Sequence, residues 1–390
     1  MSKTTIDLIA YKIEAYDSDD FIEDLKEKNL TCIVILFNPV KGYAIKGVNI
    51  DIHGFEKQWI LLFGFAGHRL KGAVYNLLSP VLISVDLIVT YSTLLFLTCK
   101  YRPRNCYVDN TFVAVFMAYL RKKDLISNLV YASQDWLGEG GKTFSVKTFH
   151  SYCFSRFFAL CDRYASKHAD LTLNHTPYIQ RKRQEYWKEF VPKNETLYFP
   201  NIRSAVNKSS LVQNDAKGRN KLLFIGHMLD HTQWSDLLSI LDRTNYRLKL
   251  VGRIHPTVTK NIRNQLLSRA PVVEFLGYRE RIDLKGIAED CLAGINLIFG
   301  KDLHTHYAIP SKVVDYLRFR IPVIVSKDIG YFGDVVSSYQ LGIVIENQME
   351  LLDAIEKIQY SYIDYRENID KFFRYFPFNR FTDYLISDPA

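Results

Sequence analysis

The chain has 390 residues, of which 48% are hydrophobic and 24% charged, and its formal net charge is +8. This composition excludes an intrinsically disordered protein, and the length is sufficient for two domains of ordinary size. A basic balance suits an anionic ligand, an anionic membrane or a nucleic acid, and composition alone leaves these open beside a surface with no such role.

The 6 cysteines are scattered along the chain without a Cys-x-x-Cys pair. Their spacing argues against a zinc site or a disulfide scaffold and suits a reducing cytosol. The N-terminal residues include early acidic side chains and no continuous apolar stretch, so we expect no signal peptide. We therefore expect a cytoplasmic protein without a bound metal.

One apolar run, Val74–Cys99, is long enough to suggest a membrane-spanning helix. Asn76, Pro80 and Asp86 interrupt it, so we favour a helix and a turn followed by a buried strand at Leu87–Thr90. A transmembrane helix is the alternative.

The first half of the chain alternates between apolar runs and segments with helical periodicity. Continuous apolar runs such as Thr31–Phe37 are typical of parallel strands buried on both faces. The expected strands are Ile6–Ala10, Thr31–Phe37, Asn49–Ile52, Asn128–Ser133 and Ala169–Asn174, and the expected helices are Ser18–Lys28, Thr111–Lys122, Phe144–Lys167 and Gln180–Phe190.

A polar stretch without periodicity, residues 201–220, separates this half from a second alternating series. In the second series the expected strands end at Gly226, Gly252 and Gly277. A doubly wound sheet places such strand ends at its ligand crevice. We predict an α/β protein with two Rossmann-like domains facing each other across a cleft. The predicted boundaries are 1–200 for the first domain, 201–220 for a linker, 221–370 for the second domain, and 371–390 for a C-terminal helix that crosses back to the first domain.

The segment Ile309–Ser326 contains a predicted short helix followed by a buried strand. Pro310 and Ser311 are a helix-start signal, with serine expected to cap free N–H groups, and Pro322 disfavours helix at the preceding residue. The N-terminus of this helix carries partial positive charge, which suits a phosphate. An ordinary helix without a ligand is the alternative.

These motifs together resemble the GT-B glycosyltransferases, and the second half resembles the retaining glycosyltransferase family 4 group. The resemblance covers most of residues 85–385 and is strongest from 221 to 346. It rests on the segments LLFIGHM (222–228), LKLVGR (248–253), VEFLGY (273–278), AEDCLAGINLI (288–298), IPSKVVDYLRFRIPVIVS (309–326) and GIVIENQMELLDAIEKI (342–358), with NLVYASQDW and ADLTLNHTPYIQRKR in the first half.

The resemblance implies a nucleotide-sugar donor, UDP- or GDP-linked, bound by the second domain with no other cofactor. The diphosphate would lie on the amides of Ser311 and Lys312, with the Lys312 ammonium close by. Asp315 stands where the family usually has a glutamate that holds the ribose. Tyr307 stands where the family often has a glutamate that contacts the sugar. The strand ends at Gly226, His227, Gly252 and Tyr278 would border the donor.

One departure from the family concerns the phosphates. Many members carry an arginine and a Lys-Gly pair after the first strand of this domain, whereas this chain has Met228 and LDHTQW. Negative charge develops on the departing diphosphate, so some cation must stabilise it. Arg253 and Lys312 are the candidates, with His227 a weaker one, and a surface arginine at a strand end is the alternative for Arg253.

For the acceptor, the ends of the first-domain strands are the expected location. Asp135 is a candidate to orient an acceptor hydroxyl, and Trp136 is a candidate to stack on a sugar ring. A capping aspartate and a core tryptophan are the alternatives. His175 follows the next strand and is the weaker acceptor candidate, with a structural role as the alternative.

The basic helix Gln180–Phe190 and the cluster Lys100–Arg104 are either solvated faces or contacts to an anionic bilayer. No nucleic-acid-binding module is evident. The overall prediction is a cytoplasmic glycosyltransferase, peripheral to the inner membrane face, that acts on a glycan or a lipid-linked acceptor with retention. A nucleotide-sugar epimerase and a non-catalytic binding or scaffold protein of the same fold are the alternatives.

Overall fold

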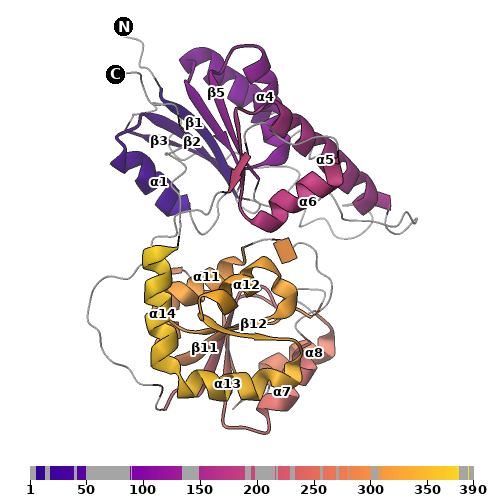
Figure 1. Cartoon of the computed structure of the whole chain (residues 1–390), viewed down its shortest axis with the longest axis vertical. Coiled ribbons are helices and arrows are strands. Elements are labelled where there is room, and N and C mark those ends of the chain that lie inside the picture. Colours follow the sequence, from indigo (N-terminus) through magenta and orange to yellow (C-terminus); the bar gives the residue numbers. More distant parts are fainter. Residues whose placement is uncertain are drawn as a thin grey trace. The chain divides into compact units, whose positions relative to one another are not determined.

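The structure is a computed structural model of the 390-residue chain. It describes residues 6–13, 18–38, 42–49, 88, 90–133, 149–188, 195–197, 216, 218–228, 233–254, 258–268, 272–279, 281–299, 306–307, 309–376 and 385. The chain divides into two compact units (Figure 1). Unit 1 comprises Met1–Ile202 with Phe378–Ala390, and unit 2 comprises Arg203–Pro377.

Unit 1 contains a seven-stranded sheet in the order β3-β2-β1-β4-β5-β6-β7. Every neighbouring pair is parallel except β2 and β3, which are antiparallel. The strands are β1 (Leu8–Ile13), β2 (Cys32–Asn38), β3 (Gly42–Val48), β4 (Asn105–Val108), β5 (Asn128–Ser133), β6 (Leu171–Asn174) and β7 (Glu195–Leu197). The sequence did not predict β3, β4 or β7, which are short or lie on an edge.

Helices cover both faces of this sheet, because successive side chains of a buried parallel strand point to opposite sides. In β1, Ile9 joins a core completed by α4 (Thr111–Lys122), whereas Ala10 joins a second core that contains Phe21 of α1 (Ser18–Glu27). Leu385, near the C-terminus, packs against this second core. The remaining labelled helices of unit 1 are α5 (Phe149–His168) and α6 (Pro177–Trp187).

Residues 90–101 form a further helix, so the strand expected at Leu87–Thr90 is wrong. Thr90, Leu94 and Leu97 are buried, and this spacing of four and three residues is that of a helix face. Tyr91 fixes the helix to α4 by stacking on Phe116, with ring centres 4.5 Å apart. A short apolar run does not by itself distinguish a strand from a buried helix.

Unit 2 contains a six-stranded sheet in the order β10-β9-β8-β11-β12-β13, and all of its strand pairs are parallel. The strands are β8 (Lys221–Ile225), β9 (Arg247–Val251), β10 (Val273–Gly277), β11 (Cys291–Asn296), β12 (Val323–Ser326) and β13 (Gly342–Ile345). The strand order reverses between β8 and β11, and the carboxyl ends of these two strands define the ligand crevice of a doubly wound sheet.

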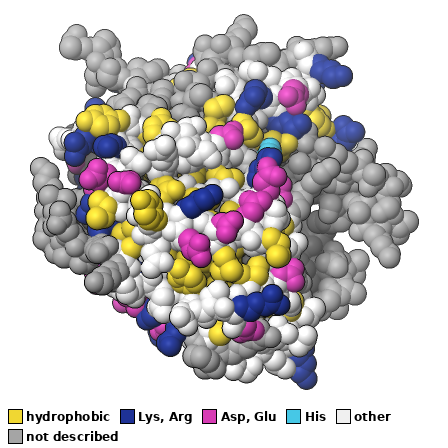
Figure 2. Space-filling view, turned by 60° about the horizontal axis from the view of Figure 1, so that its bottom comes forward, with side chains coloured by type: hydrophobic (Ala, Val, Ile, Leu, Met, Phe, Trp, Pro, Cys, Tyr) yellow, Lys and Arg dark blue, Asp and Glu magenta, His cyan; other side chains and the backbone are white. Residues whose placement is uncertain are grey.

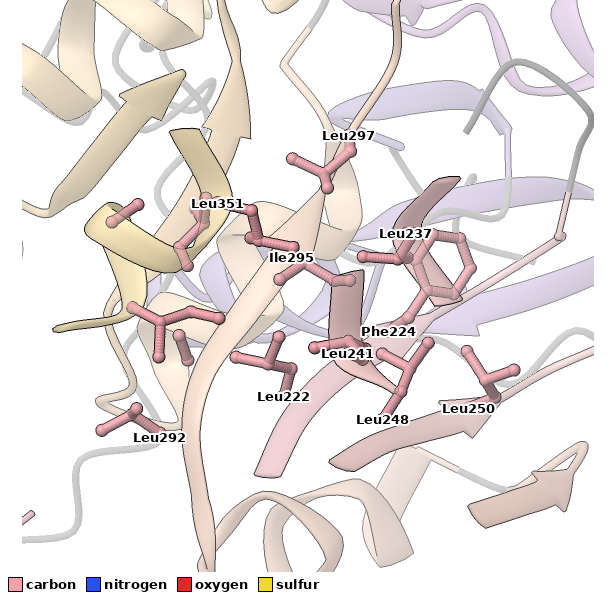
Figure 3. Packing of buried hydrophobic residues seen from close by; sticks show 14 of the residues in the cluster. Leu222, Phe224, Leu237, Leu241, Leu248, Leu250, Leu292, Ile295, Leu297 and Leu351 are labelled. Atoms are coloured by element: carbon pink, nitrogen blue, oxygen red, sulfur yellow. The ribbon is translucent and has the colours of Figure 1, made fainter. Parts of the chain in front are cut away.

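The core on one face of this sheet joins the strands to α7 (Trp234–Leu241) and α13 (Leu351–Tyr360). Figure 3 shows Leu222, Leu248 and Ile295 from three different strands gathered with Leu237 and Leu351 from the helices. Among the described residues of unit 2, further helices are α8 (Lys260–Ser268), α9 (Arg281–Ala288), α11 (Ser311–Arg318), α12 (Tyr331–Ser338) and α14 (Tyr362–Tyr375). Short 3-10 helices are described at Lys327–Ile329 and Gln348–Glu350.

The predicted α/β class with two Rossmann-like domains is confirmed by these two sheets. Of the C-terminal helix expected at 371–390, residues 371–375 belong to α14, and residues 377–384 and 386–390 lie outside the described part of the chain. Among the described residues, no helix has the length and apolar character needed to cross a membrane.

Candidate functional site

Three glycines close the strands β8, β9 and β10 of unit 2 at the carboxyl edge. Gly226, Gly252 and Gly277 have φ angles of +120°, +132° and +66°, a region that side chains other than glycine rarely adopt. The N–H of Gly252 donates to the carbonyl of Gly277 at 2.8 Å. A Cβ on Gly252 would collide with the Gly226 carbonyl, so glycine here allows two strand ends to approach closely.

Helix α11 is fixed against the same edge by Tyr316, which is fully buried. Its hydroxyl accepts a hydrogen bond from the N–H of Ile225 at 2.8 Å and donates to the carbonyl of Ile295 at 3.2 Å. A Cβ on Gly294 would strike the Tyr316 ring, so this glycine makes room for the ring. The two bonds span the crevice strands β8 and β11 and position the N-terminus of α11 above them.

The start of α11 differs in one respect from the sequence prediction. Pro310 is the N-cap residue and Ser311 is the first helical residue, so Ser311 does not cap the helix. No side chain caps this N-terminus in the described structure. Val313 and Val314 donate their N–H groups to the Pro310 carbonyl. The N–H groups of Ser311 and Lys312 point out of the first turn and have no partner within the helix.

Lys312 lies in the first turn of α11 and reaches back over the end of β8. Its Nζ is 4.6 Å from the centre of the Phe224 ring and would lie 3.8 Å from a Cβ built on Gly226. No ion pair joins Lys312 to a carboxylate among the described residues. Burial lowers the pKa of Lys312 to about 8, and an anion bound beside the amine would favour its protonated form.

Arg253 and Tyr278 follow the next two glycines and lie against each other. The guanidinium carbon of Arg253 is 5.3 Å from the centre of the Tyr278 ring, and Tyr278 is 57% exposed. Arg253 and His227 are also exposed. Arg253 follows Gly252, and Gly252 closely approaches Gly226, the glycine over which Lys312 extends. The Arg253 cation and the Tyr278 ring therefore lie at the same edge of the sheet as Lys312.

The three residues that depart from the family pattern, Met228, Asp315 and Tyr307, are each buried or half-buried. Met228 is fully buried in the unit 2 core, so no charge occupies that position. Asp315 is half-buried one turn beyond Lys312. Tyr307 is buried, and its ring centre is 5.2 Å from that of His306 in an edge-to-face arrangement.

Of the three acceptor candidates, the structure describes His175 alone. Asp135 and Trp136 lie outside the described residues. His175 is buried directly after β6, and its N–H donates to the carbonyl of Ser133 at the end of β5 at 3.5 Å. The fold therefore brings His175 beside the strand end from which Asp135 follows.

Two contributors to this arrangement were not predicted as site residues. Phe224 looked like an ordinary strand residue, yet its ring lies below the Lys312 amine. Tyr316 looked like one more apolar position of a helix, yet it carries the hydrogen bonds that fix α11. A tyrosine within an apolar helix face was the available signal, since a buried hydroxyl requires a partner.

Chemically, the carboxyl edge of unit 2 combines an uncapped helix N-terminus with a half-buried cation and glycine-lined strand ends. Such a combination binds phosphate groups, because N–H groups, the helix dipole and the ammonium all favour negative charge.

Comparisons with known proteins agree with this class of fold. Residues 300–388 match the family model described as "Glucosyltransferase 3-like, C-terminal domain". No curated protein sequence matches the chain.

Solved structures resemble nearly the whole chain at low sequence identity. Sucrose-phosphate synthase from Thermosynechococcus elongatus has a TM-score of 0.61 at 14% identity, over 94% of this chain and 95% of that one. The apo form of the lipopolysaccharide outer core galactosyltransferase WaaB has a TM-score of 0.55 at 12% identity, over 96% and 98%. UDP-GlcNAc 2-epimerase from Methanocaldococcus jannaschii, in complex with UDP-GlcNAc and UDP, has a TM-score of 0.51 at 11% identity, over 91% and 93%. The chain thus has the GT-B fold that these enzymes share.

Proposed function

We propose that the chain is a glycosyltransferase that moves a sugar from a UDP- or GDP-linked donor to a cell-surface glycan or a lipid-linked acceptor. The proposal includes retention of anomeric configuration and membership of the retaining family 4 group. The GT-B fold and the glucosyltransferase-like match over residues 300–388 support the reaction class.

The observation that carries the proposal is Lys312, a half-buried amine without an ion-pair partner in the described structure, at an uncapped helix N-terminus. The donor diphosphate would bind the amides of Ser311 and Lys312, with Asp315 on the ribose and Tyr307 near the sugar. Lys312 and Arg253 would stabilise the charge that develops on the departing diphosphate. These cations and the helix dipole supply the positive charge, so the proposed mechanism uses no metal.

On the acceptor side, the proposal assigns Asp135 to the acceptor hydroxyl, with Trp136 and His175 nearby. Peripheral attachment to an anionic membrane is part of the proposal, through Lys100–Arg104 and α6. In α6, however, Trp187 lies under the guanidinium of Arg163 on α5, with 5.4 Å between guanidinium carbon and ring centre, which draws this side chain toward α5. Among the described side chains on the face in Figure 2, positive and negative charges are interspersed.

Two alternatives are kept because specific observations favour them. An epimerase in complex with UDP-GlcNAc shares the fold, so a nucleotide-sugar epimerase is one alternative. The buried Met228 in place of the family's arginine favours a non-catalytic binding protein as the other.

Calorimetry with UDP, GDP and their sugars tests the proposal, followed by product analysis with and without acceptor. We expect one nucleotide to bind the wild type, and we expect Lys312→Ala to abolish binding or turnover. Epimerisation without an acceptor would establish the first alternative. Absence of binding by every nucleotide would rule out the transferase.

A further inference from the structure

A buried amide lies at the crevice of unit 2, at the carboxyl end of β11. Asn296 is 1% exposed, and in the described part of the chain neither its Nδ2 nor its Oδ1 has a hydrogen-bond partner. An amide side chain offers two N–H donors and a carbonyl acceptor, and leaving buried polar groups unsatisfied is costly. Buried polar groups without partners are rare in native proteins and need a specific explanation.

The position of Asn296 on the strand determines the direction of its side chain. Ile295 and Leu297 both join the core in Figure 3, so alternation turns Asn296 to the opposite face. Gly294 points to that same face, where the Tyr316 ring of α11 covers it. Asn296 is two residues nearer the carboxyl end of β11 than Gly294. It therefore lies toward the first turn of α11.

The strand register places this amide beside the phosphate-binding features. Gly294 pairs with Leu223 of β8, so the register brings Asn296 level with Ile225, the residue before Gly226. Gly226 is the glycine over which Lys312 extends. The amide therefore lies at the point where the strand order reverses.

We propose that Asn296 is a donor-binding residue whose amide N–H groups bind the β-phosphate end of a nucleoside diphosphate or its sugar, directly or through one ordered water. This inference rests on the proposed function and adds a group that the sequence pattern did not single out. An amide donor suits phosphate oxygens, and a neutral group adds no repulsion to the nearby Lys312 cation.

The neighbouring Ser326 provides a contrast. It is also fully buried, but its hydroxyl accepts from the N–H of Ile298 at 2.9 Å and donates to the Ile298 carbonyl at 2.7 Å. Ser326 thus stabilises the chain locally, whereas the amide of Asn296 has no such bond to any residue that the structure describes.

The test compares Asn296→Leu with wild type, using UDP, GDP and the corresponding monophosphates as probes for calorimetry. We expect Asn296→Leu to keep or raise the melting temperature, because it replaces an unsatisfied buried amide by an apolar side chain of similar shape. We also expect it to weaken diphosphate binding by about tenfold or more while leaving monophosphate binding unchanged. Asn296→Asp, which adds a negative charge, should weaken diphosphate binding further and serves as a second variant if the leucine variant does not fold.

Ser326→Ala is the matched control, and we expect it to lower the melting temperature without changing the affinity. Wild-type affinity of Asn296→Leu for the diphosphate would overturn the inference and leave the proposed function standing. Equal loss of monophosphate and diphosphate binding would overturn it as well, because it indicates a general structural effect. If the wild type binds no nucleotide, both the inference and the proposed function are wrong.

Discussion

At the scale of single residues, the most informative side chain is that of Lys312. Its position after a helix-start proline was readable from the sequence, but its burial against Phe224 was not. Burial without a carboxylate partner disfavours the ammonium form and brings the pKa from 10.5 to about 8. An arriving diphosphate would reverse this effect, because an anion favours the protonated amine.

This lowered pKa predicts opposite pH dependences for ligand binding and for stability. UDP or GDP affinity should fall as the pH rises through about 8, because the amine loses its charge. In the ligand-free protein the unfolded chain binds more protons at this residue between pH 8 and 10.5, so its contribution to stability should rise over that range. Calorimetry and urea denaturation from pH 6.5 to 10 measure the two trends.

Lys312→Met is the control for both trends. The variant has no titrating amine at this position, so the difference from wild type isolates the lysine. If wild type and Lys312→Met show the same pH dependence of stability, the lowered pKa is contradicted.

At the scale of elements, α11 is held to the sheet by one hydroxyl that bridges two strands. Tyr316→Phe keeps the ring but leaves the N–H of Ile225 without its partner. We expect a loss of about 1–3 kcal/mol in the free energy of unfolding. We also expect weaker nucleotide binding, because the N-terminus of α11 is no longer fixed over β8.

Urea denaturation and calorimetry of Tyr316→Phe give the two quantities. Tyr360→Phe is the matched control, since Tyr360 lies on α13 of the same unit and is 94% exposed. A stability of Tyr316→Phe equal to that of this control would contradict the bridging role.

In unit 1, a fully buried ion pair joins helices α5 and α6. Arg183 donates to Asp162 through Nε at 2.9 Å and through Nη2 at 3.1 Å, and both side chains are inaccessible to solvent. Arg183 also donates to Asn174 of β6, and Tyr131 of β5 donates to Asp162 at 2.8 Å. Arg183 of the basic helix expected at Gln180–Phe190 is therefore buried in the interior and is not part of a charged surface.

Removing one partner of this pair should be far more damaging than removing both. Arg183→Met should lower the free energy of unfolding by roughly 3–5 kcal/mol, because the Asp162 carboxylate then stays buried and unpaired. The double variant Arg183→Met with Asp162→Leu should recover part of that loss. A double-mutant cycle by urea denaturation measures the coupling, and additive losses would contradict it.

At the scale of the whole molecule, each unit has its own sheet and its own hydrophobic core. The unit 2 core contains residues from Ala216 to Tyr362, all within Arg203–Pro377. Leu385 packs against the second core of unit 1, and unit 1 comprises Met1–Ile202 together with Phe378–Ala390. The two compact units therefore do not correspond to a single cut in the sequence.

This arrangement predicts that residues 203–377 fold when expressed alone. The fragment should unfold cooperatively in urea and bind the same nucleotide as the full chain, because every proposed donor residue lies within it. Circular dichroism and calorimetry on the fragment provide the test. A fragment that folds but binds no nucleotide would show that unit 1 contributes to the donor site.

Much of the fold could be predicted from the sequence because it depends on local patterns. Apolar runs such as Asn128–Ser133 match the observed strands, and the glycines that end β8, β9 and β10 were recognisable because left-handed backbone favours glycine. The strand predicted at Leu87–Thr90 was the failure, since a short apolar run fits either a strand or a buried helix until its neighbours are known. The edge strand β3 was also missed.

By itself, the sequence determined the α/β class, the alternation of strands and helices, and the helix start at Pro310. Only the tertiary structure decided how the candidate site is built. It placed Phe224 beneath Lys312, fixed α11 through Tyr316, and buried the amide of Asn296 at the carboxyl end of β11. The physical reason is that propensity and periodicity act over neighbouring residues, whereas burial, pKa and hydrogen-bond partners depend on elements that are distant in the chain.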